Sequence, residues 1–262
     1  AELIRDTRAG YVVNFASQSM VGQSWQVPEH WFMTNTVSTI KLHDRLRQYS
    51  FLKKYVHIST PEVYGANESL IVENENYSPS TPYAVSRAAA DMSLRTFFDN
   101  YGFPVIFTRA ANVYGPGQQL YRIIPRAVLY FRIGETLQLH GGGHSVRSFI
   151  HISDVVDGTL KAMTDADPGQ TFHLSTRDHI SIRSLIETIA EEMGVDFDRY
   201  VETVDDRPGK DLAYLLDSDL ARKTLGWDET VSLKNGIRQV IDWVDGNLET
   251  IKKQPMNYVH KA

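Results

Sequence analysis

Three short apolar runs, each followed by polar residues, constrain the fold of this chain most strongly. The runs are residues 11–16 (YVVNFA), 55–59 (YVHIS) and 105–108 (VIFT). Runs of this length are typical of strands that are buried on both faces, as in a parallel sheet. The segments 31–49 and 82–101 between them carry helical patterns, so strands and helices alternate. This order predicts an α/β fold with a doubly wound parallel sheet.

The same periodicity predicts further elements. On segment 31–49 the expected apolar side consists of Phe32, Val37, Ile40, Leu42 and Leu46. Later helices are expected at 121–134, 181–193, 218–226 and 232–248, and strands at 137–140 and 172–174. A further helix is expected to begin near residue 154, capped by Ser153 or Asp154, because these side chains accept hydrogen bonds from free helix N–H groups.

A tyrosine and an arginine stand four residues apart in Tyr83-Ala84-Val85-Ser86-Arg87. The prolines end at Pro82, which is the behaviour expected at a helix start, so Tyr83 and Arg87 share one helix face. A cation beside a phenol favours the phenolate, so the pKa of Tyr83 is expected to be lowered. Such a tyrosine can exchange protons with a sugar hydroxyl. Taken alone, the pair is more typical of two exposed side chains on a surface helix, because pairs at this spacing are common.

Two flanking motifs change that balance. Residues 55–65 read YVHISTPEVYG and residues 108–117 read TRAANVYGPG. With the Tyr83–Arg87 motif, they resemble the extended short-chain dehydrogenase/reductases that act on nucleotide sugars. Within that group the chain is most similar to the NDP-sugar 4,6-dehydratases, of which dTDP-glucose 4,6-dehydratase is the best-known type. The resemblance covers nearly the whole chain, and it is more specific for the superfamily than for the substrate.

The resemblance implies an architecture and a set of partners. Residues 1–115 are expected to form a Rossmann-like NAD-binding domain that carries the catalytic residues. Residues 116–262 are expected to form mainly a smaller α/β lobe for the nucleotide-diphosphate sugar, with some chain returning to the sheet. NAD is the implied cofactor, and a homodimer through the helices that include 82–101 is the implied assembly.

The resemblance also assigns catalytic roles. Tyr83 is the base for the C4 hydroxyl, Thr60 orients that oxygen, and Glu62 takes the C5 proton. Arg87 stands where the family has lysine, and it is bulkier and planar, so the exchange is not conservative. Pro61 stands where the dTDP-glucose enzymes have the aspartate that protonates the departing C6 hydroxyl. Glu62 is therefore expected to act as both base and acid.

Binding residues follow from the same comparison. Ligands of parallel sheets bind beyond the carboxyl ends of the strands, where several of these residues lie, although the serines there could instead cap a helix. The expected cofactor contacts are Phe15, Ala16, Ser17, Thr34, Tyr83, Arg87 and Val113. The expected substrate contacts are Ser19, Asn112, Arg122, Arg126, Arg147 and Arg207. For the arginines the alternative is a surface ion pair or a solvated helix charge.

One expected feature is missing from the sequence. A dinucleotide fold usually opens with a strand, a glycine-rich turn and a helix, because glycines let the backbone approach the pyrophosphate. Gly141-Gly142-Gly143 comes too late in the chain for that turn. The sequence is therefore interpreted as lacking the first strands of the sheet and the phosphate cradle. A nucleotide-sugar 4-epimerase or decarboxylase, and a catalytically silent binding protein, remain alternative interpretations.

Composition excludes several other functions. The net charge of −5 and the lack of a basic run argue against a nucleic-acid partner. The chain has no cysteine, so disulfide and thiolate chemistry are excluded. The nine histidines show no spacing typical of a metal site. No apolar stretch is long enough for a membrane span, and no signal peptide opens the sequence, so a cytoplasmic protein is expected.

Overall fold

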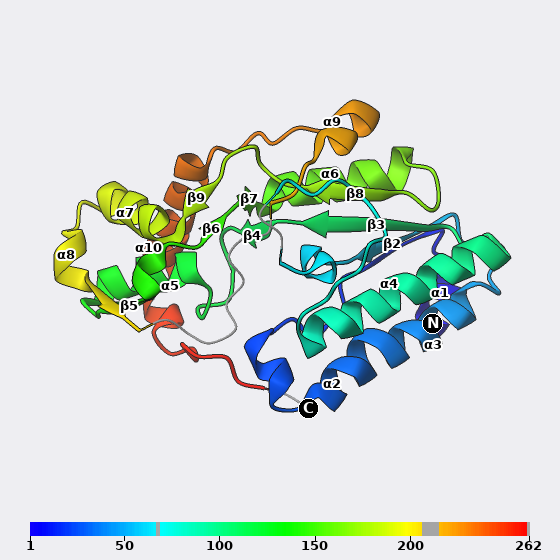
Figure 1. Cartoon of the computed structure of the whole chain (residues 1–262), viewed down its shortest axis with the longest axis horizontal. Helices are drawn as coiled ribbons and strands as arrows, with labels where there is room; N and C mark the ends of the chain where they lie inside the picture. Colours follow the sequence, from blue (N-terminus) through cyan, green and yellow to red (C-terminus); the bar gives the residue numbers. More distant parts are fainter. Residues whose placement is uncertain (67–68, 206–214, 261–262) are drawn as a thin grey trace.

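The computed structural model describes residues 1–66, 69–205 and 215–260. Its centre is a parallel four-stranded sheet in the order β1 (Tyr11–Asn14), β2 (Lys54–Ile58), β3 (Val105–Ala110) and β8 (Thr171–Leu174) (Figure 1). The predicted doubly wound α/β fold is confirmed. β1 ends at Asn14, two residues earlier than expected, because the Asn14 side chain turns the chain by accepting a hydrogen bond from Ala16 N.

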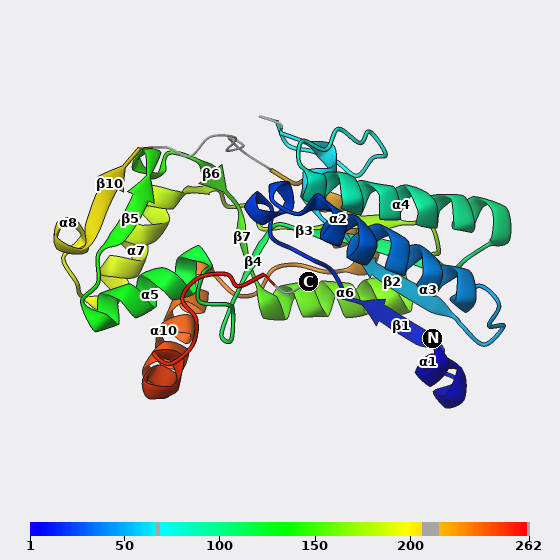
Figure 2. The ribbon, with the colours of Figure 1, turned by 90° about the horizontal axis from the view of Figure 1, so that it is seen from below.

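Helices cover both faces of this sheet. One face carries α3 (Thr39–Leu46) and α4 (Pro82–Tyr101), which lie side by side, and the other carries α6 (Ile152–Asp165) (Figure 2). The short α1 (Glu2–Thr7) precedes β1. Among the described residues, no helix is both long and apolar enough to cross a membrane.

The predicted helix 31–49 is interrupted. It divides into α2 (Pro28–Trp31), a π-helical segment (Phe32–Ser38) and α3. The buried positions are Trp31, Asn35, Thr39, His43 and Leu46. Of the expected apolar side, Leu46 is fully buried and Leu42 packs against the same core, whereas Phe32, Val37 and Ile40 are only partly buried. The buried side is polar because α4 offers hydroxyl partners there: Ser86 to Asn35 at 2.9 Å and Ser93 to His43 at 3.2 Å.

The second lobe packs three helices around a core of its own. These are α5 (Ile123–Ile133), α7 (Ile182–Met193) and α10 (Leu233–Ile251), which bury mainly Ile, Leu and Val side chains. Smaller elements complete the lobe and its junction with the sheet: parallel pairs β5 (Leu137–His140) with β10 (Val201–Val204) and β4 (Asn112–Tyr114) with β7 (Phe149–His151), the antiparallel pair β6 (Val146–Arg147) with β9 (Ile180–Ser181), and helices α8 (Phe197–Tyr200) and α9 (Asp219–Leu225).

The start of α6 shows how the chain returns from this lobe to the sheet. His151, rather than Ser153 or Asp154, caps α6, and its side chain accepts a hydrogen bond from Ser153 N at 3.3 Å. The Asp154 carboxylate instead accepts hydrogen bonds from Thr230 N and Oγ1, at 3.0 and 2.7 Å. The predicted cap was therefore wrong, because the helix begins at Ile152 and the Asp154 carboxylate is hydrogen bonded to Thr230 in the loop before α10.

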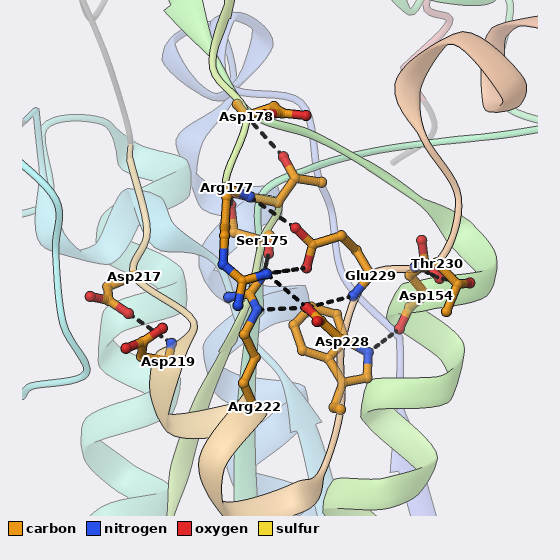
Figure 3. Close-up of polar contacts among 12 residues, drawn as sticks. Asp154, Ser175, Arg177, Asp178, Asp217, Asp219, Arg222, Asp228, Glu229 and Thr230 are labelled. Atoms are coloured by element: carbon orange, nitrogen blue, oxygen red, sulfur yellow. Dashed lines mark hydrogen bonds and ion pairs between the residues drawn. The ribbon is translucent and has the colours of Figure 1, made fainter.

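An ion-pair cluster fixes α9 against the end of β8. Figure 3 shows the Arg222 guanidinium between Asp228, at 2.8 Å, and Glu229, while it also donates to the Ser175 carbonyl at 3.0 Å. Arg177 also donates to Asp228, at 3.1 Å. These contacts hold the loop between α9 and α10 beside the end of β8. Because this loop leads into α10, the cluster is an additional connection between the sheet and the second lobe.

Candidate active site

The carboxyl ends of the sheet strands face the second lobe across a cavity of about 730 Å³. Residues from both parts of the chain line it, and they include most of the site residues that were singled out from the sequence. The predicted site residues in this lining are Ser19, Thr60, Glu62, Tyr83, Asn112, Val113, Arg122 and Arg147. The cavity therefore brings together three of the four predicted catalytic side chains, all but Arg87, and four of the six predicted substrate contacts.

Thr60 and Glu62 are placed by a short 3₁₀ turn that follows β2. The turn spans Pro61–Tyr64, and the Thr60 hydroxyl caps it by accepting a hydrogen bond from Glu62 N at 3.4 Å. Pro61 occupies the first helical position, where the missing N–H costs nothing and the fixed φ suits the turn. Pro61 thus has a structural role, and the turn presents Thr60 and Glu62 to the same cavity.

Tyr83 enters from the first turn of α4. The Thr81 side chain caps this helix by accepting from Ala84 N at 3.1 Å, and Tyr83 N donates to Ser24 Oγ at 3.1 Å. The phenol is 8% exposed and is hydrogen bonded to Thr60. Sequence reasoning missed Ser24, because its role depends on the fold of a distant turn.

The expected lowering of the Tyr83 pKa is not observed. Burial raises the pKa of Tyr83 above its ordinary value, and the nearby Glu62 carboxylate adds to the rise. Arg87, the Thr60 hydrogen bond and Arg122 act in the opposite direction but do not outweigh burial. The sequence showed that Arg87 would lie near Tyr83, but it did not show how deeply the Tyr83 phenol is buried.

Arg87 points away from the cavity and into the sheet. Its side chain is buried, with 2% exposure, and Nη2 donates to the Ile58 carbonyl and lies 3.4 Å from His57 Nε2. Within the described part of the chain, its buried Nε has no hydrogen-bond partner. The guanidinium therefore lies behind Tyr83, held by β2, with one donor still unused.

The predicted cofactor contacts lie along the edge of the sheet. Phe15, Ala16 and Ser17 form an exposed turn after β1, and the Phe15 ring is 62% exposed. Thr34 is half-buried in the π-helical segment, next to Asn35. The Asn35 side chain accepts from Gln18 N at 2.8 Å and donates to Ser86 of α4, so it ties this turn to the helix of Tyr83.

These residues fit the nicotinamide half of a dinucleotide. They would offer a planar ring aromatic and aliphatic contacts, because Tyr83 and Val113 line the cavity and the Phe15 ring is exposed after β1. We identify no glycine-rich strand-to-helix turn in the sequence that could hold the pyrophosphate.

The remaining predicted contacts separate into two groups. Asn112 and Arg147 line the cavity, and their side chains also donate to the carbonyls of Ser148 and Val146, at 3.1 and 2.8 Å. Arg126 lies instead on an adjoining cavity of about 710 Å³, where it donates to the Met256 carbonyl at 2.6 Å. Arg207 lies outside the described residues.

A buried polar network behind the cavity was also missed. It joins Asp91 of α4 to Ser59 and His57 of the β2 segment and to Arg109 of β3. The signal in the sequence was the presence of His57 and Arg109 within otherwise apolar strands, since polar side chains in buried strands need partners.

Comparisons with known proteins agree on one family. The family model described as GDP-mannose 4,6 dehydratase matches residues 1–240. The chain is 31% identical over 242 residues to a trifunctional UDP-glucose 4,6-dehydratase/UDP-4-keto-6-deoxy-D-glucose 3,5-epimerase/UDP-4-keto-L-rhamnose-reductase of Arabidopsis thaliana, covering 91% of this chain but only 36% of that protein. It is 30% identical over 261 residues to dTDP-glucose 4,6-dehydratase of Xanthomonas campestris, covering 92% of this chain and 74% of that enzyme.

Solved structures show the same relationship. The dTDP-glucose 4,6-dehydratase DesIV of Streptomyces venezuelae, solved with NAD and TYD bound, superposes with a TM-score of 0.89 at 31% identity, over 95% of this chain and 77% of that one. A UDP-glucose 4-epimerase of Thermotoga maritima, solved with UDP-glucose, also gives 0.89, at 28% identity, over 94% of this chain and 81% of that one. Dehydratases and epimerases thus share this fold.

Proposed function

Because the chain belongs to the GDP-mannose 4,6-dehydratase family of extended short-chain dehydrogenase/reductases, we propose that it is an NAD-dependent nucleotide-sugar 4,6-dehydratase. Its product would be a 4-keto-6-deoxy NDP-hexose. The observation that carries the proposal is the placement of Glu62 in one cavity with Thr60 and Tyr83. Oxidation at C4 needs only the last two, whereas elimination of water needs a carboxylate as well.

Each side chain has a distinct task. Tyr83, hydrogen bonded to Thr60, takes the proton of the C4 hydroxyl as that carbon is oxidised. The C4 ketone acidifies the C5 proton, which passes to Glu62. As a carboxylic acid, Glu62 then protonates the departing C6 hydroxyl, so one water leaves. Pro61 has no proton to donate, so Glu62 performs both transfers.

NAD, when bound, takes up the hydride from C4, returns it to C6, and adds a positive charge to the cavity. The residues that would hold its nicotinamide end are Tyr83 and Val113 in the cavity and Phe15, Ala16, Ser17 and Thr34 at the sheet edge. The Arg87 guanidinium contributes its positive charge from behind Tyr83. Among the described residues, its Nε has no hydrogen-bond partner, so this donor can still form a bond.

The sugar nucleotide would lie between the two parts of the chain. Arg122 and Arg147 bring two guanidinium groups to the cavity that holds Tyr83, and guanidinium forks suit diphosphate oxygens. Ser19 and Asn112 add polar contacts on the sugar side. Arg126 in the adjoining cavity and Arg207 complete the proposed set of nucleotide contacts.

We also propose that the protein is a cytoplasmic homodimer that pairs through α4 and the π-helical segment. Val85, Met92 and Met33 on these helices are 38%, 53% and 46% exposed, and neighbouring apolar side chains of this size are typical of an interface. Light scattering should give twice the mass of one chain. The variant Met92→Glu should lower the measured mass to that of a single chain. A monomeric unmodified protein would contradict the proposal.

The activity itself is tested by mass spectrometry. The protein, expressed from its natural coding sequence, would be incubated with NAD and with dTDP-, UDP-, GDP- or CDP-hexoses. Loss of one water from one of these substrates supports the dehydratase. A product of unchanged mass with inverted C4 would identify an epimerase, as in the structurally similar UDP-glucose 4-epimerase. Loss of carbon dioxide from a uronic acid would identify a decarboxylase, and either outcome would overturn the proposal.

A further inference from the structure

A single buried carboxylate joins the two elements that carry the catalytic residues. Asp91 lies on α4, four residues after Arg87 and eight after Tyr83, and therefore on the same side of the helix. It is fully buried and accepts a hydrogen bond from Ser59 Oγ at 2.6 Å. Ser59 immediately precedes Thr60, so this contact holds the residue from which the catalytic turn begins.

Two further contacts anchor the same carboxylate. Arg109 of β3 donates to Asp91 Oδ2 at 2.9 Å, and His57 Nε2 of β2 lies 3.4 Å from Oδ1. His57 Nε2 is in turn 3.4 Å from Nη2 of Arg87. Asp91 therefore links α4 to two neighbouring strands, and through His57 it reaches the cation behind Tyr83.

The charge of this carboxylate is kept despite its burial. Burial alone would raise the pKa of Asp91, but the His57 hydrogen bond and the Arg109 charge hold the pKa below its ordinary value. Burying an ion pair costs desolvation energy, and apolar side chains of similar volume often stabilise a core equally well. A stability role therefore explains the cluster poorly. Two of its contacts, from Ser59 and His57, come from the segment directly before Thr60, which suggests a geometric role.

We propose that Asp91 is a positioning residue of the site: through Ser59 it holds the start of the Thr60–Glu62 turn at the distance and angle from α4 that place both side chains against Tyr83. The proposal rests on the proposed dehydratase function for its kinetic consequence. Thr60 and Glu62 belong to one rigid turn, capped by Thr60 itself, so a shift at Ser59 displaces both together. Displacements of about 1 Å can cost about 100-fold in rate.

The first test removes the contact from the strand side. Ser59→Ala leaves the Asp91–Arg109 ion pair in place and deletes only the hydroxyl. We expect kcat to fall about 10- to 100-fold, with KM for the sugar nucleotide changed less than about two-fold, because the reacting groups lose alignment while binding is retained. Ser59→Thr, which keeps a hydroxyl, should restore most of kcat.

A matched control and a double variant separate positioning from general stability. Ser175→Ala removes a fully buried serine hydroxyl at the end of β8, which donates to the Thr176 carbonyl, and should leave kcat unchanged. If Ser59 acts through Asp91, the double variant Ser59→Ala/Asp91→Asn should lose no more kcat than Asp91→Asn alone. Multiplicative losses, or a kcat for Ser59→Ala within about two-fold of the unmodified protein, would overturn the proposal.

A readout that does not need turnover distinguishes this proposal from the proposed function. Tyrosines labelled with ¹³C at Cζ would be observed by NMR, with the Tyr83 signal assigned from Tyr83→Phe. The Tyr83–Thr60 hydrogen bond should weaken in Ser59→Ala, so the Tyr83 signal should move, whereas Ser175→Ala should leave it in place. An unmoved signal overturns the positioning role. If the unmodified protein dehydrates none of the substrates, the proposed function is overturned. A shift of the Tyr83 signal in Ser59→Ala would still support the positioning role of Asp91.

Discussion

The proposed mechanism has Tyr83 act on the C4 hydroxyl and Glu62 on the neighbouring C5 proton, and the Glu62 carboxylate affects the pKa of Tyr83. The Glu62 carboxylate contributes to the raised pKa of Tyr83, while Arg87 and Thr60 oppose that rise. In the proposed mechanism the two groups act in succession: Tyr83 on the C4 hydroxyl, then Glu62 on the C5 proton. Removing one of them should therefore stop the reaction at a different step from removing the other.

The first prediction concerns Glu62→Gln. The amide cannot accept the C5 proton, so turnover should fall by about 10²- to 10⁴-fold, the usual contribution of a positioned base. Oxidation at C4 should continue, because Thr60 and Tyr83 remain. The 4-keto hexose that accumulates can be trapped with borodeuteride and detected by mass spectrometry. Tyr83→Phe should yield no trapped ketone.

Two comparisons make this prediction specific. Glu249→Gln, on an exposed carboxylate of α10, should behave as the unmodified protein does. Deuterium exchange at C5 in D₂O should disappear in Glu62→Gln. Near-normal turnover with continued C5 exchange would show that another group is the base, and the main argument for dehydration over epimerisation would be lost.

For single residues, the sequence predicted which side chains share a helix face better than it predicted the direction in which they point. The spacing of Tyr83 and Arg87 predicted a shared helix face, and both side chains are buried on that face. The direction of Arg87 could not be predicted, because its acceptor, the Ile58 carbonyl, and the neighbouring His57 ring belong to a strand far away in the chain. The rise in the Tyr83 pKa was missed for the same reason: burial depends on the complete fold, whereas the nearby cation is visible in the motif.

Among the elements, α4 matters most, because it carries Tyr83, Arg87 and Asp91 along its buried side. Its bounds, residues 82–101, were predicted correctly because both ends have clear signals: Thr81 and Pro82 at the start and Gly102 in the left-handed region at the end. The segment 31–49 lacked comparable internal signals. Its π-helical turn shifts the buried side toward Asn35 and His43, a change that apolar periodicity alone does not indicate.

The second prediction concerns the cap of α4. Thr81→Ala removes the acceptor for Ala84 N and should lower the free energy of unfolding by about 1 kcal/mol. Ser232→Ala removes the corresponding cap of α10, which accepts from Asn235 N, and should cost a similar amount. Chemical denaturation measures both. Only Thr81→Ala should also lower kcat, because the first turn of α4 positions Tyr83. Equal activity in the two variants would mean that the cap does not influence the site.

At the scale of the whole molecule, buried histidines link stability to pH. Burial lowers the pKa of His43 to about 4 and that of His173 to about 3, both from an ordinary value of 6.5. Both rings are fully buried, and His173 contacts the Tyr64 hydroxyl at 2.8 Å. The folded protein therefore binds protons at these two sites less readily than the unfolded chain does.

The third prediction follows from that difference. The stabilising contribution is fully present above pH 6.5 and is lost as the pH falls toward the folded pKa values. Each histidine should steepen the loss of unfolding free energy by about 1.4 kcal/mol per pH unit in this range. Urea denaturation at several pH values should show His43→Gln reducing this slope. Ser93→Ala, which removes only the hydrogen-bond partner of His43, should destabilise the protein without changing the slope.

The segment that follows α10 connects the two parts of the molecule. In Figure 1 it runs from the end of α10 toward α2. Arg126 of α5 donates to its Met256 carbonyl at 2.6 Å, and the Tyr258 hydroxyl donates to Gln18 Oε1 at 3.4 Å. His260 stacks on Trp31, with ring centres 5.0 Å apart. This segment thus spans from the second lobe to the turn after β1 that is proposed to contact NAD. Sequence patterns could not predict its position, because the segment has no apolar periodicity.

The fourth prediction tests that connection. The double variant Tyr258→Ala/His260→Ala removes both contacts to the sheet side, so Trp31, which is fully buried, should become accessible. Hydrogen–deuterium exchange should increase in peptides that cover residues 16–19 and 28–31, while the core of the second lobe keeps its protection. The KM for the sugar nucleotide should rise, since one of the connections between the two walls of the cavity is lost. Val259→Ala, which alters an exposed side chain of the same segment, should change neither exchange nor KM. If the double variant exchanges as Val259→Ala does, the segment rests on the surface without restraining the two parts, and the cavity must be held by α6, α9 and the sheet alone.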